Sequence, residues 1–139
     1  MDTLTADKWL YATLKASSTL NAQIGGSSNP RIYSEIAPSS ATYPLVIMKQ
    51  MSARPVLGVG STLIMFNEIW LVKAVDKAAT STALGAILNA VRTVLHKASG
   101  TATSGTIIGC AEEGSVRYSE TDAGIIYKHF GLTFRVYSQ

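Results

Sequence analysis

Cys110 and His129 are the two residues of this sequence that could combine into a catalytic site, because an imidazole can activate a thiol as a nucleophile. If the last β-turn is centred near residues 121–122, Cys110 pairs across the hairpin with Thr133. His129 then lies on the wet face of the strand, about 13 Å from the thiol, which is too far for proton transfer. We therefore predict a packed thiol, and we interpret the other histidine, His96, as a cation at a helix end.

Glu112 and Glu113 are adjacent carboxylates in a predicted strand. Neighbouring residues of a strand point to opposite faces, so these two cannot act together as an acid–base pair. Two interpretations remain open. The carboxylates belong to a solvated bulge near Glu112–Gly114, or they form ion pairs across a contact between subunits.

The aromatic residues and the cations give little support for nucleic-acid binding. The 12 Lys and Arg residues outnumber the 9 Asp and Glu residues, for a formal charge of +3, but they are dispersed singly along the chain. We interpret four aromatic residues as core rather than as a stacking platform for bases: Phe66, Trp70, Phe130 and Phe134. The sequence predicts no catalytic residue, no cofactor and no metal ligand set, since the single cysteine has no ligand-type spacing.

Composition predicts one domain over residues 1–139, which is an ordinary domain length. Charged residues make up 15% of the chain, against roughly 25% in typical globular proteins. Such a surface suggests partial cover by partners, although Ser and Thr could supply the polarity instead. The start lacks the pattern of a signal peptide, and the longest apolar run, 69–72, is far too short to span a membrane, so we expect a cytosolic origin.

Periodicity predicts the elements that would position these residues. The segment 124–137 alternates apolar and mixed positions, as a half-buried strand does. The segment 80–97 carries an apolar stripe of helical spacing, and Thr80, Ser81 or Thr82 could cap the start of this helix. Within 63–76, residues 69–72 are apolar on both faces, which predicts cover by helices on both sides or by a second subunit. The predicted elements are helix 4–20, a short extended piece 31–33, strands 45–52 and 63–76, helix 80–97, and strands 106–117 and 124–137, with a polar loop at 99–105.

The predicted fold class is therefore α+β: a mixed or antiparallel sheet of two long β-hairpins plus a short strand, packed with two helices, in the order α-β-ββ-α-ββ. The hairpin tip at 53–62 is expected to interrupt strand pairing, because it contains Pro55 and two glycines.

Several stretches, in this order and spacing, resemble the tail completion or tail terminator proteins of long-tailed bacteriophages. The resemblance covers residues 5 to 137, and the polar loop at 99–105 departs from it. The stretches that carry it are Arg31-Ile32-Tyr33, Ala37-Pro38 and Tyr43-Pro44-Leu45-Val46-Ile47, a helix with Ala86, Leu88, Ala90, Val91 and Leu95, and the closing segments from Tyr118 to Tyr127 and from Phe134 to Tyr137.

The resemblance implies a non-enzymatic structural virion protein. It implies a hexameric ring of identical subunits at the head-proximal end of the tail tube, which stops tube polymerisation and provides the head–tail joining interface. The implied partners are the tail tube protein and a head–tail connector or stopper protein; DNA passes through the ring without specific binding, and no membrane is involved. The implied location is the neck region of the virion, after assembly in the host cytoplasm. The alternatives are another neck connector component and a small nucleic-acid-binding module.

The hairpin tip is the best candidate for a docking element. Val56, Leu57 and Val59 are apolar and Arg54 adds a positive charge, whereas a tip that only has to turn is usually short and polar. We expect these residues, together with Glu112 and Glu113, to lie at a partner or subunit interface. The alternative is that the three apolar side chains fold back onto their own core.

Overall fold

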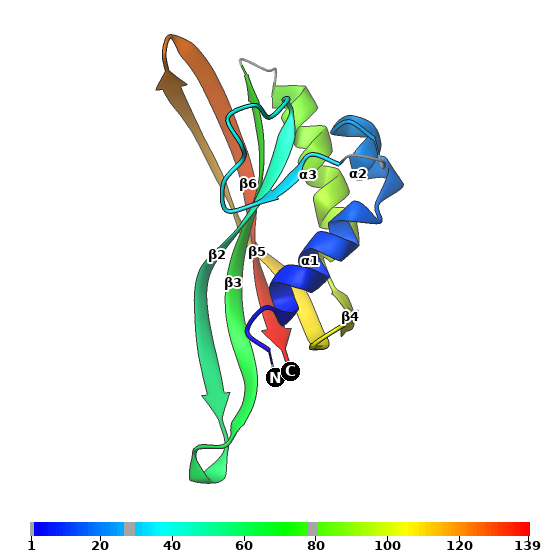
Figure 1. Cartoon of the computed structure of the whole chain (residues 1–139), viewed down its shortest axis with the longest axis vertical. Coiled ribbons are helices and arrows are strands. Elements are labelled where there is room, and N and C mark those ends of the chain that lie inside the picture. The colour runs from blue at the N-terminus through cyan, green and yellow to red at the C-terminus, as the bar shows by residue number, and fades with distance from the viewer. Residues whose placement is uncertain (1, 27–29, 78–80) are drawn as a thin grey trace.

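The computed structural model describes residues 2–26, 30–77 and 81–139, and it shows one six-stranded mixed sheet with three helices on one face (Figure 1). The strand order is β1-β2-β3-β6-β5-β4; β1 runs parallel to β2 and every other pair is antiparallel. The α+β class is confirmed, and the proposed cap Thr80 lies outside the described residues. The elements are α1 Thr5–Lys15, α2 Ser18–Gln23, β1 Ile32–Ser34, β2 Leu45–Leu57, a 3-10 turn Val59–Ser61, β3 Leu63–Lys77, α3 Ser81–Leu95, β4 Ala98–Ala102, β5 Gly105–Asp122 and β6 Ile125–Ser138.

The first predicted helix, 4–20, is in fact two helices. The break falls at Ser17, whose backbone is extended and whose hydroxyl oxygen accepts a hydrogen bond from the Leu20 N–H at 3.2 Å. Serine at this position favours starting a new helix over continuing the old one. Asn21 then donates its side-chain amide to the Lys15 carbonyl at 2.6 Å, which fixes the two helices at the corner.

The predicted loop 99–105 is wrong, because most of it forms the edge strand β4. This strand pairs with the start of β5, and α1 packs over it. A Cβ atom on Gly100 would lie 2.9 Å from Nε1 of Trp9, so the glycine is what lets the indole approach the strand. Small and polar residues carry little β propensity, which is why the sequence pattern did not indicate a strand here.

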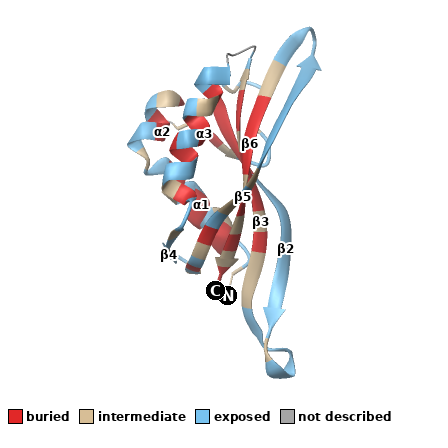
Figure 2. Ribbon diagram, turned by 180° about the vertical axis from the view of Figure 1, so that it is seen from behind, coloured by how far each residue is buried: buried red, intermediate tan, exposed pale blue. Residues whose placement is uncertain are grey.

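The core lies between the helices and the sheet, as Figure 2 shows in red. The predicted stripe of α3 is confirmed: Leu84, Ile87, Leu88, Val91 and Leu95 are all buried, and Val94 is partly buried against the same core. Three of the four predicted core aromatics are buried, namely Trp70, Phe130 and Phe134, whereas Phe66 is only half-buried.

The two apolar faces of residues 69–72 are explained without helices on both sides. Trp70 and Val72 join the helix-side core, while Leu71 is buried against the opposite face. There it lies over Gly131, where an added Cβ would be 2.8 Å from the Leu71 side chain. Farther along that face, a loop over residues 35–43 covers a second small cluster of Leu45, Ile47 and Val75. Within the described residues, the helices cover one face only.

Both long hairpins differ in detail from the sequence-based prediction. β2 and β3 stay paired as far as Leu57 and Leu63, so the real turn is 58–62 and not 53–62. Pro55 is tolerated because β1 pairs only with residues 46–48, and in the described structure the outer edge of β2 is free beyond them. The last turn centres on Ala123 and Gly124, both with positive φ, as tight hairpin turns require.

The distal parts of these hairpins extend past the helices at opposite ends of the long axis (Figure 1). We call them the β2–β3 arm, residues 51–65, and the β5–β6 arm, residues 115–128. Each arm has two strands over most of its length, and none of the described helices packs against it, so most of its side chains are exposed. In the part of the chain that the structure describes, none of the helices is long and apolar enough to cross a membrane.

Candidate functional site

The observed register excludes a catalytic pair of Cys110 and His129, in agreement with the prediction of a packed thiol. Cys110 pairs with Val136 and not with Thr133, and it faces the helix-side core. His129 pairs with Tyr118, so it lies farther from the thiol than the sequence suggested. Burial raises the pKa of the Cys110 thiol to about 12, which keeps it protonated and unreactive at neutral pH.

His129 was predicted to lie on the solvent-facing side of the strand, but in the structure it is buried. Its ring stacks on Tyr118 with 4.4 Å between centroids, and Glu120 Oε2 lies 3.4 Å from its Nε2. Burial lowers the pKa of His129, the Lys73 charge lowers it further, and Glu120 opposes both. Among the described residues, no group of three or more His, Cys, Asp and Glu side chains is arranged to hold a metal ion.

His96 acts as a hydrogen-bond acceptor and not as the predicted helix-end cation. Its Nδ1 accepts the backbone N–H of Glu112 at 3.1 Å, which a doubly protonated imidazole cannot do. The contact ties the end of α3 to the middle of β5.

The bulge predicted near Glu112–Gly114 is confirmed by a shift of register between these residues. The two carboxylates point to opposite faces, as neighbouring strand residues do, and each meets an arginine of the same chain. Glu112 accepts from Arg92 Nε at 2.5 Å on the helix side, and Glu113 accepts from both Nε and NH2 of Arg135 on the other side. The structure therefore gives both carboxylates partners within one chain, and their place at a subunit contact stays a prediction.

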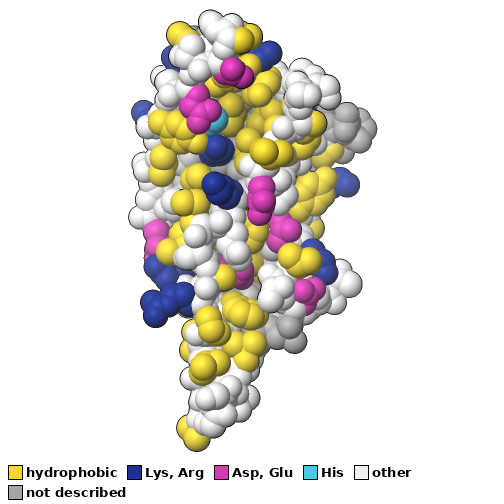
Figure 3. All heavy atoms as spheres, turned by 60° about the vertical axis from the view of Figure 1, so that its left-hand side comes forward, with side chains coloured by type: hydrophobic (Ala, Val, Ile, Leu, Met, Phe, Trp, Pro, Cys, Tyr) yellow, Lys and Arg dark blue, Asp and Glu magenta, His cyan; other side chains and the backbone are white. Residues whose placement is uncertain are grey.

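The β2–β3 arm carries the four predicted docking residues on its surface. Leu57 is 54% exposed and Val59 fully exposed, and Val56 and Arg54 are exposed as well. The alternative in which the apolar side chains fold back onto the core is therefore wrong. Figure 3 shows hydrophobic side chains gathered on this end of the molecule. Met51, Leu63 and Ile64 add exposed apolar surface that the sequence-based list of site residues did not include.

The β5–β6 arm is a second exposed apolar element, and sequence reasoning missed it. Val116, Tyr118, Ile125 and Ile126 are each more than a third exposed. The signal was present in the sequence: two consecutive isoleucines at the start of a strand place apolar side chains on both faces. Because only a paired strand lies beside them, both faces remain open.

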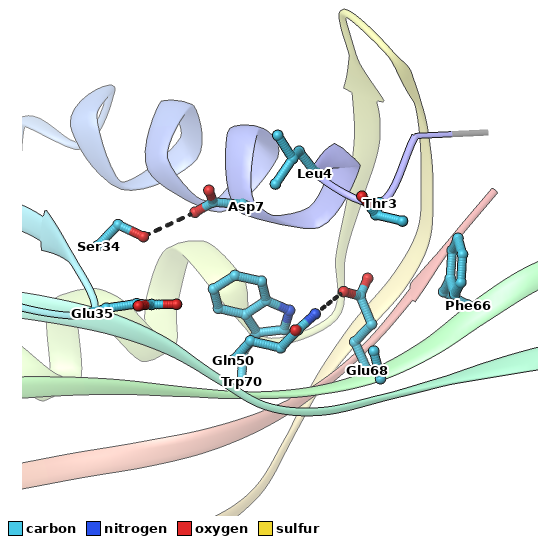
Figure 4. Close-up of a pocket in the computed structure, with 10 residues that line it drawn as sticks. Thr3, Leu4, Asp7, Ser34, Glu35, Gln50, Phe66, Glu68 and Trp70 are labelled. Atoms are coloured by element: carbon cyan, nitrogen blue, oxygen red, sulfur yellow. Dashed lines mark hydrogen bonds between the residues drawn. The ribbon is translucent and has the colours of Figure 1, made fainter.

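A pocket of about 280 Å³ lies on the helix side of the sheet, at the base of the β2–β3 arm. Figure 4 shows Glu68 on its floor between Trp70 and Phe66, with Leu4 and Asp7 of the N-terminal segment opposite. Glu68 is 2% exposed; it accepts hydrogen bonds from Gln50 Nε2 at 2.6 Å and Ser138 Oγ at 3.0 Å. Burial raises the pKa of Glu68, while the Ser138, Gln50 and Trp70 donors oppose the shift.

The polar floor of this pocket is incompletely satisfied. Trp70 is 4% exposed, and its buried Nε1 has no partner within hydrogen-bond distance among the described residues, although its interaction with Glu68 lowers the pKa of that carboxyl. Asp7 and Glu35 also line the pocket, so three carboxylates face one cavity. Sequence reasoning missed the pocket, because Asp7, Glu35 and Glu68 come from three separate elements and show no common spacing.

Comparison with known proteins agrees with this architecture. The family model described as "Tail completion protein gp17" matches residues 8–138. A chain from the virion of a native gene transfer agent particle has the same fold, with a TM-score of 0.76 over 99% of this chain and 98% of that chain at 16% sequence identity. No curated protein matched the sequence. The chain belongs to the tail completion protein family and is a structural protein of a phage-type virion tail.

Proposed function

We propose that this protein forms a hexameric ring on the head-proximal end of the phage tail tube, where it ends tube polymerisation and offers the surface that joins the tail to the head. Its partners are further copies of itself, the tail tube protein and a head–tail connector or stopper protein. DNA passes through the ring without specific binding, and the protein works in the virion neck after assembly in the host cytoplasm. Family membership is the basis of this proposal.

The observation that carries this proposal is that the β2–β3 arm and the β5–β6 arm extend past the helices at opposite ends of one continuous sheet (Figure 1). A closed ring is built from heterologous contacts, in which two different surfaces of a subunit meet the two neighbours. Exposed apolar patches of this kind mark protein contacts. Each arm exposes several large apolar side chains and lies far from the other, so the chain has two distinct surfaces for assembly.

We assign the β2–β3 arm to docking against the tail tube or a neighbouring subunit, through Arg54, Val56, Leu57 and Val59. We place Glu112 and Glu113 at the subunit contact as well. In the described structure β4 pairs with β5 only as far as Cys110, so beside the two carboxylates no strand covers the edge of β5, where His96 accepts the backbone N–H of Glu112. Their ion pairs with Arg92 and Arg135 hold this part of the edge in one shape.

Tail assembly with and without this chain tests the proposal. We expect tails assembled in its absence to contain tubes of uncontrolled length that do not join heads, and addition of the chain to restore tails of one length. Tails of normal length that fail only to join heads would make the protein a connector component and would contradict the terminating role. Normal, head-joined tails in its absence would contradict the whole proposal.

A further inference from the structure

We propose that the acidic pocket at the base of the β2–β3 arm receives Arg54 from the arm of a second copy of this chain. Pocket and arginine together would then form the repeating contact of the ring. The inference rests on the proposed ring and adds to it the residues that join one subunit to the next.

The pocket lacks a cation. Carboxylates are almost never fully buried unless they are paired, yet Glu68 is 2% exposed and has only neutral donors around it, namely Gln50, Ser138 and Trp70. Asp7 and Glu35 add negative charge at the same cavity. All the residues that line the pocket are described, and none of them is Lys or Arg.

Trp70 gives a second sign of a missing ligand, because it forms part of the pocket wall beside Glu68 (Figure 4). Its buried indole N–H has no acceptor within hydrogen-bond distance among the described residues, although it lies near enough to the Glu68 carboxylate to oppose the rise of that group's pKa. A chain segment that carries a cation fits this arrangement, because its side chain donates to the carboxylates while its backbone carbonyl oxygens can accept from the indole.

The β2–β3 arm of another copy has both chemical features. Arg54 is exposed, and no hydrogen bond or ion pair involves it within the described chain. The outer edge of β2 is unpaired from Lys49 onward in the described structure, so the backbone carbonyls that point to this edge, and not to β3, are free. The planar guanidinium can bind a carboxylate with two hydrogen bonds and stack on an aromatic ring, which suits a pocket walled by Phe66 and Trp70.

The geometry excludes the same contact within one chain and favours it between copies. Ala53 lines the pocket, and Arg54, the next residue of the strand, points to the opposite face of the sheet. One face of the arm base therefore presents carboxylates, while the other face presents a cation. Two complementary surfaces that face away from each other are what a head-to-tail contact requires.

Site-directed cross-linking tests the contact while Arg54 and the carboxylates stay intact. Ser34→Cys places a thiol at the pocket rim, and Ser52→Cys places one beside Arg54; the native Cys110 is buried. A mixture of the two single variants with a short bismaleimide linker should give a cross-linked dimer, and the double variant a ladder that ends at the full ring. Ser34→Cys mixed with Ser115→Cys, on the other arm, is the matched control and should give no dimer.

Charge reversal provides a second test with a different readout. Arg54→Glu should raise the concentration needed for ring assembly roughly 30-fold or more, because it places a fourth carboxylate in the pocket. Adding Glu35→Arg to this variant should recover much of the loss. Lys49→Glu, the same change on the same strand outside the contact, should change that concentration by less than about threefold.

The results separate this inference from the proposed function. Rings that form with Arg54→Glu as readily as without it, or wild-type rings whose thiols at 34 and 52 do not cross-link, would overturn the pocket contact and leave the ring intact. A chain that stays monomeric both alone and with tail tubes would overturn the ring, and the pocket contact with it.

Discussion

The middle of the sheet and the β2–β3 arm are built from the same two strands but have opposite surroundings. Val46 and Met48 of β2 are completely buried under the helices, whereas Leu57 of the same strand is 54% exposed. Both segments are rich in apolar residues, so composition does not distinguish them. What differs is the layer of helices, which covers the middle and stops before the arm (Figure 2). Apolar residues in the middle stabilise the fold, and those in the arm remain available for assembly.

The largest expected effect follows from breaking the covered region. Leu88→Asp would bury an unpaired carboxylate on the core face of α3, which should destabilise the chain by more than about 4 kcal/mol and prevent folding. Ala86→Asp, on the exposed side of the same helix, is the matched control and should fold. Circular dichroism and thermal melting measure both. An unchanged melting temperature for Leu88→Asp would show that the helix does not cover the sheet in solution.

An intermediate effect is expected at the thiol. Cys110→Ser leaves the shape of the side chain nearly unchanged but buries a hydroxyl, so we expect a loss of about 1–3 kcal/mol with normal assembly. Because the pKa of Cys110 is raised to about 12 in the folded chain, the unfolded chain releases this proton first as pH rises. Stability should therefore fall from about pH 9 upward, and the fall should be smaller in Cys110→Ser. Loss of assembly by a normally folded variant would give the thiol a function that its burial argues against.

The smallest effect on stability is expected in the arm. Replacing Val56, Leu57 and Val59 with Ser should change the free energy of unfolding by no more than about 0.5 kcal/mol per site, because these side chains are exposed. The same variant should fail to end tails or join them to heads. Ile36→Ser combined with Ile108→Ser, two exposed sites outside both arms, is the control for loss of apolar surface. A much lower melting temperature with normal assembly at low temperature would place the three residues in the core and contradict the docking role.

Periodicity could predict the covered region because burial leaves a pattern. The stripe of α3 and the alternation of β6 from Phe130 to Val136 follow directly from which side faces the core. The break of the first helix at Ser17 and the strand β4 depend instead on local hydrogen bonds and on the contact of Gly100 with Trp9. Such contacts join residues far apart in the sequence and leave no periodic signal.

The candidate sites were only partly predictable for a related reason. Val56, Leu57 and Val59 stood out because apolar residues are unusual at a predicted turn, and Arg54 stood out because it adds a positive charge there. The register of the last hairpin was predicted wrongly, mainly because the turn centres on residues 123–124 and not on 121–122, and the bulge at Glu112–Gly114 shifts the pairing again before Cys110. The acidic pocket could not be predicted from the sequence, because only the fold brings Asp7, Glu35 and Glu68 together.

Electron microscopy of purified tails that carry this chain tests the central claim most directly. The account predicts one hexameric ring of the 14.8 kDa chain at the head-proximal end of every tail and none elsewhere. Subunits distributed along the tube, single copies at its end, or no copies on complete tails would contradict it.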